Sequence, residues 1–255
     1  MLLPLALALL LAAPQTDPEV RRTPLVPAPV QDALESTQPR AVALEDLPYH
    51  GDRALLDVEG VALTAFELNG LVAYYRSFRP GADALLLRDA VDALLPSKVM
   101  EARLAAELPA MKERIDAARA ALVDGRPWEE VVAEWSDDSE APTADARYDF
   151  VREVAVQPFD RLTHTTPVGT ITEPFLTKYG YHFLQVLAYA RDEEDPRLDR
   201  ATVRHVLVMY PSMRTRDRAG EDIRAWIRGQ VADAKLRVLE AGQENLLPAA
   251  HRARD

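Results

Sequence analysis

The sequence predicts an α+β protein in which a helical N-terminal region precedes a small antiparallel sheet. Two observations support this fold class. Residues 83–124 carry apolar side chains three and four positions apart, which is the period of a helix buried on one face. Residues 181–189 and 202–210 are instead rich in β-branched and aromatic side chains, as buried strands are. About a dozen residues join the two runs, which is enough for antiparallel pairing.

The composition limits the classes of function. The chain has 255 residues, 48% of them hydrophobic and 28% charged, which suits one or two globular domains. Its 41 acidic and 30 basic residues give a net charge of −11, so a nucleic-acid-binding surface is not expected. There is no cysteine, which excludes disulfides, thiolate catalysis, cysteine-bound zinc and iron–sulfur clusters.

The N-terminus predicts export. Residues 1–13 are almost wholly apolar, yet as a helix they would span only about 20 Å, less than the ~30 Å hydrocarbon core of a membrane. Signal peptides have hydrophobic regions of this length, and a misassigned start or a short buried segment is the alternative. No later run is long and apolar enough for a transmembrane helix. Residues 14–48 are rich in Pro, Gln, Thr and charge, which predicts a disordered linker.

Short strands and a helix are expected next. Residues 55–58 and 61–63 are strand-like and flank a turn at Gly60. Thr64 and Glu67 have the spacing of a capping box, in which each side chain bonds the other's backbone amide, so a helix should begin here.

The helical stretch of residues 83–124 contains two prolines. Pro96 and Pro109 are the positions at which it is expected to kink or divide. Gly125 is a typical C-cap, and Pro127 is a typical start for the next helix. That short helix has the apolar face Trp128, Val131, Val132 and Trp135.

From residue 136 the elements become short. A polar loop at 136–146 precedes an extended piece at 148–151 and a helical turn at 158–162. The two strands follow, and the last helix is expected to place five apolar side chains on one face before Gly242 ends it: Ile223, Ile227, Val231, Ala234 and Val238.

Two of the five histidines lie in the predicted strands. They are His182 and His205, whereas His50 lies at a loop edge and His251 near the C-terminus. A single histidine in a strand is more often a hydrogen-bonded core residue than a functional one. Antiparallel pairing, however, would place both in one sheet.

Asp138 and Thr177 lie in loops beside the same predicted core. An unsatisfied buried polar group costs roughly 1–3 kcal/mol, so a hydrogen-bonded His–His–Asp–Thr cluster would indicate a function.

Other catalytic motifs are missing. The sequence has no phosphate-binding glycine loop, no H-E-x-x-H zinc motif and no G-x-S-x-G elbow. The acidic stretch around Asp138 lacks the spacing and glycine of a calcium-binding EF-hand loop, so it is read as solvated. A metal-dependent enzyme would have to use His164, His182, His205 and Asp138, whose spacing is not that of a ligand set. No metal or organic cofactor is expected.

Residues 128–188 resemble the body of a parvulin-type (rotamase) peptidyl-prolyl isomerase domain. AARAALVDGRPWEEVVAEWSDDS resembles the family's helix signature, and VGTITEPFLTKYGYHFLQVLAY resembles its closing segment. The second match is the most specific, because Gly169, Pro174, Thr177, Gly180 and His182 fall at family positions without a gap. RHVLVMYP, which contains His205, resembles the family's first strand.

The resemblance implies an isomerase site. His182 and His205 would be the histidines of the last and first strands, and Thr177 the threonine before the closing strand. Asp138 would stand where family members carry Cys or Asp. The proline pocket would be lined by Phe159 and, as a weaker match, Phe150.

Residues 55–111 resemble the N-terminal helical region of exported parvulin chaperones of the SurA and PrsA kind. This implies unfolded or proline-containing polypeptide clients and a periplasmic or cell-envelope location. The expected organisation is a signal peptide (1–13), a linker (14–48), a helical region (49–113), a parvulin-like domain (114–190) and a C-terminal strand and helix (191–255).

Two departures leave alternatives open. The strand with His205 follows the domain body, whereas the family has it first; either the sheet is circularly permuted or a truncated second unit begins at Thr202. The family's G-G-D-L-G loop is reduced here to residues 144–147. The expected function is therefore a peptidyl-prolyl isomerase with chaperone activity, and the alternative is a catalytically degenerate parvulin-fold chaperone or binding module.

Overall fold

The computed structural model describes residue 39 and residues 47–252 of the chain. The predicted signal peptide and nearly all of the predicted linker lie outside the described residues. Within the part that is described, no helix is both long and apolar enough to cross a membrane.

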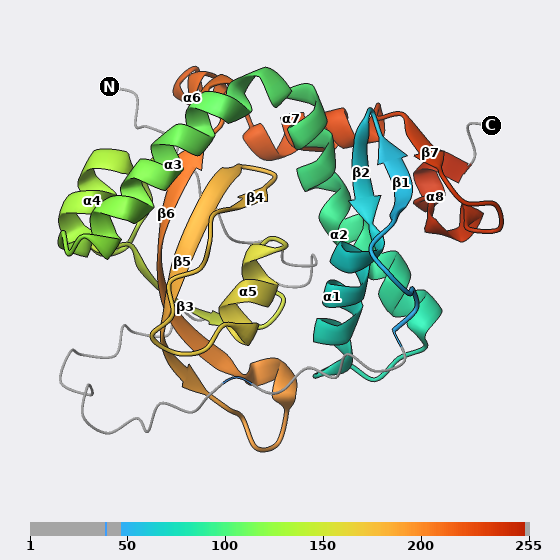
Figure 1. Cartoon of the computed structure of the whole chain (residues 1–255), viewed down its shortest axis with the longest axis horizontal. Coiled ribbons are helices and arrows are strands. Elements are labelled where there is room, and N and C mark those ends of the chain that lie inside the picture. Colours follow the sequence, from blue (N-terminus) through green and yellow to red (C-terminus); the bar gives the residue numbers. More distant parts are fainter. Residues whose placement is uncertain (1–38, 40–46, 253–255) are drawn as a thin grey trace.

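Two antiparallel sheets organise the described residues (Figure 1). The smaller sheet has the order β2-β1-β7, and the larger sheet has the order β3-β6-β5-β4. The strands of the smaller sheet are β1 (Ala54–Val58), β2 (Val61–Thr64) and β7 (Leu236–Val238); those of the larger are β3 (Arg147–Val151), β4 (Phe175–Thr177), β5 (Gly180–Ala190) and β6 (Arg200–Met209).

The helices surround both sheets. They are α1 (Ala65–Arg76), α2 (Asp83–Arg103), α3 (Leu108–Val123), α4 (Trp128–Trp135), α5 (Phe159–Thr165), α6 (Pro211–Arg218), α7 (Ile223–Ala232) and α8 (Ala249–Arg252), with short 3₁₀ turns at Ala105–Glu107, Pro196–Leu198 and Glu244–Leu246. The predicted mixture of helices and antiparallel strands is confirmed.

Helix α1 begins at the predicted capping box. The Thr64 hydroxyl accepts the Glu67 amide at 3.3 Å, and the Glu67 carboxylate accepts the Thr64 amide at 3.0 Å. Two of the amides that a helix N-terminus leaves without partners are thereby satisfied.

Only one of the two prolines divides the long helical stretch. The break falls between Arg103 and Leu108, and Pro109 lies in the first turn of α3, where it removes no intrahelical hydrogen bond. Pro96 lies inside α2, which continues through it. The stretch ends at Gly125, whose φ of +93° favours glycine.

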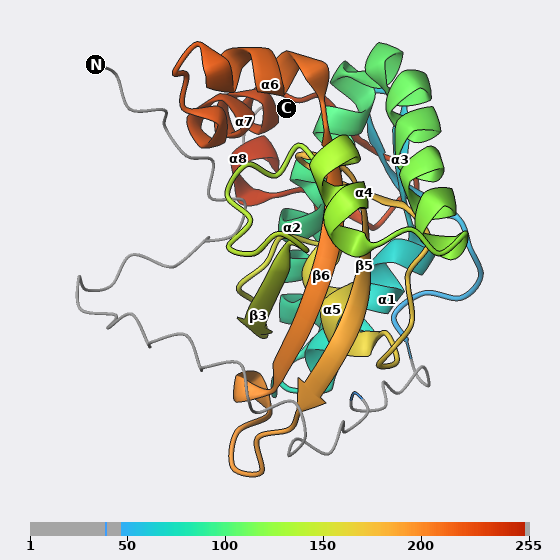
Figure 2. The same ribbon diagram turned by 90° about the vertical axis from the view of Figure 1, so that its left-hand side faces the viewer.

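The larger sheet has helices on both faces (Figure 2). Helices α3 and α4 pack on one face, where the rings of Trp128 and Phe183 meet edge to face at 5.9 Å. Helix α5 covers the other face and buries Phe159 against Leu184 and Val186. Because strand side chains alternate, the even-numbered positions from 182 to 186 all face α5.

The predicted pairing of the two long strands is confirmed. Strand β5 pairs antiparallel with β6, with His182 opposite Leu207 and Leu184 opposite His205. The two histidines are therefore diagonal neighbours on one face of the sheet.

Gly180 permits the close approach of β5 and β6 at this end. It has a φ of +145°, and a Cβ there would lie 2.2 Å from the carbonyl oxygen of Val208. No other residue fits without moving the backbone of the neighbouring strand.

The predicted last helix is wrong beyond residue 232. Helix α7 ends at Ala232, and Val238 lies in β7, paired with Leu56 of β1. Ala234 and Val238 match a helical period by coincidence, because hydrogen bonds between Glu59 and Lys235 draw the chain onto the edge of the small sheet. The sequence analysis also missed α6.

Candidate active site

Four of the predicted site residues form one hydrogen-bonded chain inside the larger sheet. Thr177 Oγ1 lies 3.0 Å from His182 Nε2, His182 Nδ1 lies 3.4 Å from His205 Nδ1, and His205 Nε2 lies 3.0 Å from Asp138 Oδ2. We call Thr177, His182, His205 and Asp138 the active-site chain. All four side chains are buried.

A donor at one end and an acceptor at the other fix the direction of these bonds. The amide of Tyr179 donates to Thr177 Oγ1 at 3.1 Å, so the threonine proton is free to point at His182. At the other end an ionised Asp138 only accepts, so His205 must carry its proton on Nε2. With both rings neutral, His182 then donates from Nδ1 to His205 and accepts from Thr177. Every polar atom of the two rings is satisfied.

The loop after α4 aims Asp138 at His205. The amide of Asp137 donates to the carbonyl of Leu207 at 2.7 Å, which ties the loop to β6. The Asp137 carboxylate is itself held by Arg114 and Arg214, each at 2.8 Å. These contacts hold the loop beside β6, where the Asp138 carboxylate reaches His205.

Burial and hydrogen bonding set the charges of the active-site chain. Burial acts to raise the pKa of Asp138, but hydrogen bonds from His205 and Tyr148 outweigh it and hold that pKa below its ordinary value. Burial, and then the neighbouring His205, lower the pKa of His182 well below its ordinary value. An ionised Asp138 and a neutral His182 follow, as the hydrogen-bond directions require.

Aromatic rings stand against the two histidines. Phe159 presents its ring edge-on to both, with centroids 5.4 Å from His182 and 5.2 Å from His205. Phe150 meets Phe159 at 6.0 Å. The structure thus brings both predicted pocket residues to the same side of the active-site chain.

Sequence reasoning missed two further aromatic residues. The Tyr148 hydroxyl donates to Asp138 Oδ2 at 2.6 Å, and its ring stacks on Phe150. Phe175, directly opposite His182 in the sheet, stacks on that histidine at 5.8 Å. The signal for Tyr148 was its place two residues before Phe150 on a strand, which puts both on one face. Nothing comparable marked Phe175, which lies in a strand of three residues.

The shortened loop at residues 144–147 still reaches the site. Ala146 adopts a φ of +50°, a conformation that glycine adopts more easily, and its carbonyl accepts the amide of His205 at 3.3 Å. Thr143 braces the loop by accepting the Arg147 amide and donating to Asp145, both at 2.8 Å. The strand with His205 is therefore supported without the glycines.

His164 is not part of the site. It lies in α5, and its ring contacts Tyr74 at 6.4 Å and Tyr189 at 5.8 Å. No group of three or more His, Asp or Glu side chains among the described residues is arranged to hold a metal ion.

The comparisons with known proteins concern the same region. Residues 96–188 match the family model of the rotamase, or PPIC-type peptidyl-prolyl isomerase, domain. The match covers Asp138, Phe150, Phe159, Thr177 and His182 but ends before β6 and His205.

Among curated proteins, the chain is 30% identical over 99 residues to a protein named chaperone SurA, from Hahella chejuensis (strain KCTC 2396). That alignment covers 38% of this chain and 23% of the relative. No solved structure matches. The family match overlaps the candidate site, so residues 96–188 are similar to the parvulin-type (PPIC-type) peptidyl-prolyl isomerase domain.

Proposed function

We propose that this protein catalyses cis–trans isomerisation of Xaa-Pro bonds in polypeptide clients. The observation that carries the proposal is the fully hydrogen-bonded active-site chain standing against the ring of Phe159. Two buried histidines in paired strands do not add to the apolar core, so a functional role explains them better than a structural one. The similarity to parvulin-type domains is consistent with such a role.

The reaction demands little covalent chemistry. Rotation about a peptide bond has a barrier of about 18–20 kcal/mol because the C–N bond has partial double-bond character. No bond is broken, so no strong nucleophile is needed. A catalyst has only to bind the twisted amide better than either planar form.

Each site residue has a part in this proposal. Phe159, with Phe150 beside it, packs on the proline ring and removes water from the amide, which weakens its resonance. His182 and His205, both neutral, present a polar surface to the carbonyl as it rotates. Thr177 and Asp138 hold the two rings in one orientation through the hydrogen bonds described above.

We propose that β6 takes the place of the family's first strand, although it follows the domain body. Two observations support this. Strand β6 lies between β3 and β5 in the larger sheet, and the contact of His205 with Asp138 completes the chain that starts at Thr177. The alternative, a truncated second unit beginning at Thr202, would leave Asp138 without its histidine.

An isomerase assay tests the proposal. Exchange between cis and trans forms of a short Xaa-Pro peptide is followed by NMR with and without the full chain. His182→Gln should lower the rate enhancement about 10–100-fold, since misplacing one buried hydrogen-bonding group costs roughly 1–3 kcal/mol. His50→Gln, on an exposed loop histidine, is the matched control. Equal activity of His182→Gln and the wild type, with both folded by circular dichroism, would remove the histidines from the mechanism.

A second candidate function is client binding without isomerisation. The exposed fraction of Phe159 is 1% and that of Phe150 is 5%, so the proline pocket is closed over by neighbouring side chains. A proline ring must displace part of this packing to enter. Suppression of aggregation of an unfolded protein, combined with no acceleration in the NMR assay, would favour this candidate.

We also propose that the protein is exported and that it is divided into the parts predicted from its sequence. We expect the apolar segment 1–13 to direct the chain to the periplasm or cell envelope, and N-terminal sequencing of the secreted form would show whether it is removed. We propose limits of 49–113 for the helical region and 114–190 for the domain body. Helices α1 and α2 lie wholly within the first part, whereas the boundary at residue 113 falls inside α3 and the family match begins at residue 96. Residues 191–255 contribute a strand to each sheet.

A further inference from the structure

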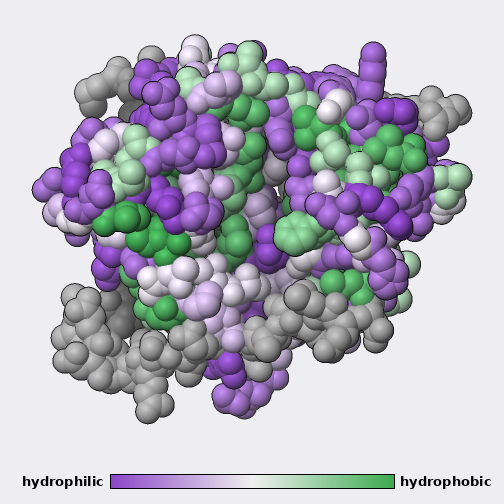
Figure 3. Space-filling model, viewed as in Figure 1, coloured by the Kyte–Doolittle hydropathy of each residue, from purple (hydrophilic) through white to green (hydrophobic). Residues whose placement is uncertain are grey.

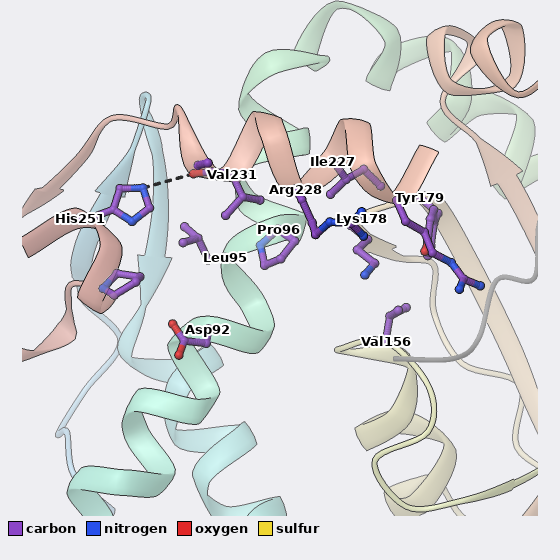
Figure 4. A pocket seen from close by; sticks show the side chains of 13 residues that line it. Asp92, Leu95, Pro96, Val156, Lys178, Tyr179, Ile227, Arg228, Val231 and His251 are labelled. Carbon is purple, nitrogen blue, oxygen red and sulfur yellow. Dashed lines mark hydrogen bonds between the residues drawn. The ribbon is translucent and has the colours of Figure 1, made fainter. Parts of the chain in front are cut away.

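A cleft of about 580 Å³ opens beside the active-site chain but contains none of its members. Its walls come from α2, α7, the segment at Pro248 and His251, and the turn between β4 and β5 (Figure 4). Apolar residues are exposed in several places on the face seen in Figure 3, one of them near the middle, between the half with the larger sheet and the half with β1 and β2. The cleft therefore lies where the two halves of the molecule meet.

The middle of the cleft is apolar. Leu95 and Pro96 of α2 face Ile227 and Val231 of α7 across it. A cleft of this volume and apolar character suits an extended polypeptide segment, whose alternate side chains can rest on apolar walls.

The two ends of the cleft differ in charge. Asp92 and His251 lie at one end, and Lys178 and Arg228 lie at the other, nearest Tyr179. Arg224 also lines the cleft, close enough to Lys178 and Tyr179 for its charge to act on both. A cluster of three cations is notable in a chain with a net charge of −11. This cluster predicts that a bound molecule carries negative charge where it meets Lys178, Arg224 and Arg228, and not where it meets Asp92 and His251.

Lys178 is the central cation of the three. Its ammonium lies 5.3 Å from the ring centre of Tyr179 and has no carboxylate within ion-pair distance among the described residues. The carboxylate nearest to Arg228 is that of Asp222, at 4.0 Å on the exposed side. Burial, followed by the charges of Arg224 and Arg228, lowers the pKa of Lys178. A bound carboxylate would offset both the burial and the repulsion.

The cationic end adjoins the candidate active site. Lys178 and Tyr179 follow Thr177 in the sequence, and the Tyr179 amide is the donor that orients the Thr177 hydroxyl. Val156, on the cleft wall, precedes Phe159 by three residues. A segment held in the cleft thus runs toward the proline pocket.

We propose that this cleft binds an extended, largely apolar polypeptide segment that carries a carboxylate, with the carboxylate held by Lys178, Arg224 and Arg228. The inference rests on the proposed function in that the segment is part of a client. It adds a selectivity: clients with an acidic group close to an apolar stretch should be preferred. The carboxylate can come from an Asp or Glu side chain or from a chain terminus.

Peptide binding to the full chain tests the charge preference. Three decapeptides of the same apolar sequence, labelled with an uncharged fluorophore, are compared by fluorescence anisotropy: one with a central Glu and an amidated end, one with Gln and an amidated end, and one with Gln and a free C-terminal carboxylate. The Glu peptide should bind about tenfold more tightly than the amidated Gln peptide, and added salt should reduce the difference. The third peptide shows whether a terminus serves as well as a side chain.

Variants locate the preference. Lys178→Gln should reduce the ratio of Glu to Gln affinities to about one, whereas Lys178→Arg should keep it. Lys112→Gln, on exposed helix α3, is the matched control and should leave the ratio unchanged. Circular dichroism confirms that each variant is folded.

A cysteine-free chain allows a second test of location. Val231→Cys places one thiol on the cleft wall, and Phe66→Cys places one at an exposed position of α1 outside the cleft. The Glu peptide should slow maleimide labelling of the first thiol and not of the second.

Three results would overturn the proposal: equal binding of the Glu and amidated Gln peptides, equal loss of both with Lys178→Gln, or no protection at residue 231. Because binding is read without turnover, its outcome is separate from that of the isomerase assay. A chain that binds the Glu peptide selectively but does not accelerate isomerisation would contradict the proposed reaction and support this inference.

Discussion

Two buried clusters in this molecule use the same residue types with different results. One is the active-site chain of Thr177, His182, His205 and Asp138. The other, which we call the junction cluster, comprises Tyr74, Arg152, Asp160, His164 and Asp199, where α1 meets α5 and the end of the larger sheet. Each contains at least one histidine and one aspartate with little or no exposure to solvent.

The clusters differ in how completely they are hydrogen-bonded. In the active-site chain each ring nitrogen has a partner. In the junction cluster, Tyr74 donates to Asp160 at 2.7 Å and Arg152 pairs with Asp199 at 2.9 Å, but two nitrogens of Arg152 have no partner. The ring nitrogens of His164 make no well-formed hydrogen bond, and the backbone of Val151 and the charge of Asp199 do not offset burial and Arg152, which lower its pKa.

The reason lies in the scaffold. Three members of the active-site chain, Thr177, His182 and His205, lie on paired strands, in which the register fixes the positions of the side chains before any of them bonds. The fourth, Asp138, lies on a loop that is tied to β6. The junction cluster is assembled from two helices and the end of a sheet, which come from separate parts of the chain, so packing decides the distances. We infer that the first cluster is positioned for chemistry and that the second links the two halves at a cost in stability.

The largest expected effect comes from the ion pair of the junction cluster. Asp199→Ala should lower the free energy of unfolding by about 3–5 kcal/mol, because it leaves Arg152 buried without its counter-charge. Urea unfolding measures the change. Asp116→Ala, which removes the partner of Lys112 on an exposed helix face, is the matched control and should cost less than about 1 kcal/mol. Equal losses in the two variants would show that burial of the pair is unimportant.

The second largest effect is expected from acidification, which changes the protonation of both clusters. Burial lowers the pKa of His164 to about 3 and that of His182 well below its ordinary value. Below about pH 6.5 these histidines are protonated in the unfolded chain but stay neutral in the folded protein. Each histidine therefore lowers the free energy of unfolding by up to about 1.4 kcal/mol for every pH unit of acidification. Asp160 acts oppositely, since burial raises its pKa to about 6 and the folded state gains a proton below that pH.

The net expectation is a loss of about 2–3 kcal/mol between pH 7 and pH 5 in urea unfolding. His164→Phe keeps a ring beside Tyr74 and removes one titrating group, so it should flatten the dependence. An unfolding free energy that is constant over this range, or identical pH curves for the variant and the wild type, would contradict the expectation.

The comparison also explains what the sequence could predict. His182 and His205 could be brought together because each lies in an apolar strand and antiparallel pairing leaves few registers. Asp138 and Thr177 followed from the family resemblance, and Phe150 and Phe159 likewise. These residues depend on local pattern and on one pairing of neighbouring strands.

The junction cluster could not be predicted in the same way. Tyr74 and Asp160 are 86 residues apart, and each lies in a helix whose pattern indicates burial but not the neighbour. Strand β7 was mistaken for helix because its pairing with β1 joins the two ends of the described chain. Contacts between segments that are distant in the sequence depend on how whole helices and strands pack together. No short sequence motif predicts such contacts.

A smaller effect is expected for Tyr148→Phe, which acts on the charge of the active-site chain. Tyr148→Phe removes the hydroxyl that donates to Asp138 and keeps the ring stacked on Phe150. The free energy of unfolding should fall by about 1.5–2 kcal/mol near neutral pH, because the acceptor of the lost hydrogen bond, the Asp138 carboxylate, is ionised. The pKa of Asp138 should rise, so the acid limb of isomerase activity should move to higher pH.

The control for this variant is Tyr181→Phe, on β5, whose hydroxyl has no hydrogen bond to the described residues. Asp138 has a depressed pKa when folded, so its contribution is present above about pH 4 and is lost as pH falls through the folded pKa. The difference in unfolding free energy between Tyr148→Phe and the wild type should therefore become smaller at low pH. An unshifted acid limb would mean that Asp138 does not set the protonation of the site.

The smallest effect is expected for Tyr74→Phe in the junction cluster. The variant removes the hydroxyl that donates to Asp160, but the amide of Gln157 still reaches the same oxygen at 3.3 Å. With a pKa of about 6, Asp160 is ionised at pH 7.5 and largely protonated at pH 5. The loss of unfolding free energy should thus be about 1 kcal/mol at pH 7.5 and less at pH 5, and the isomerase rate should follow only the change in stability. An equal loss at both values would mean that Asp160 keeps one charge state throughout, and the junction would then not respond to acid as its burial requires.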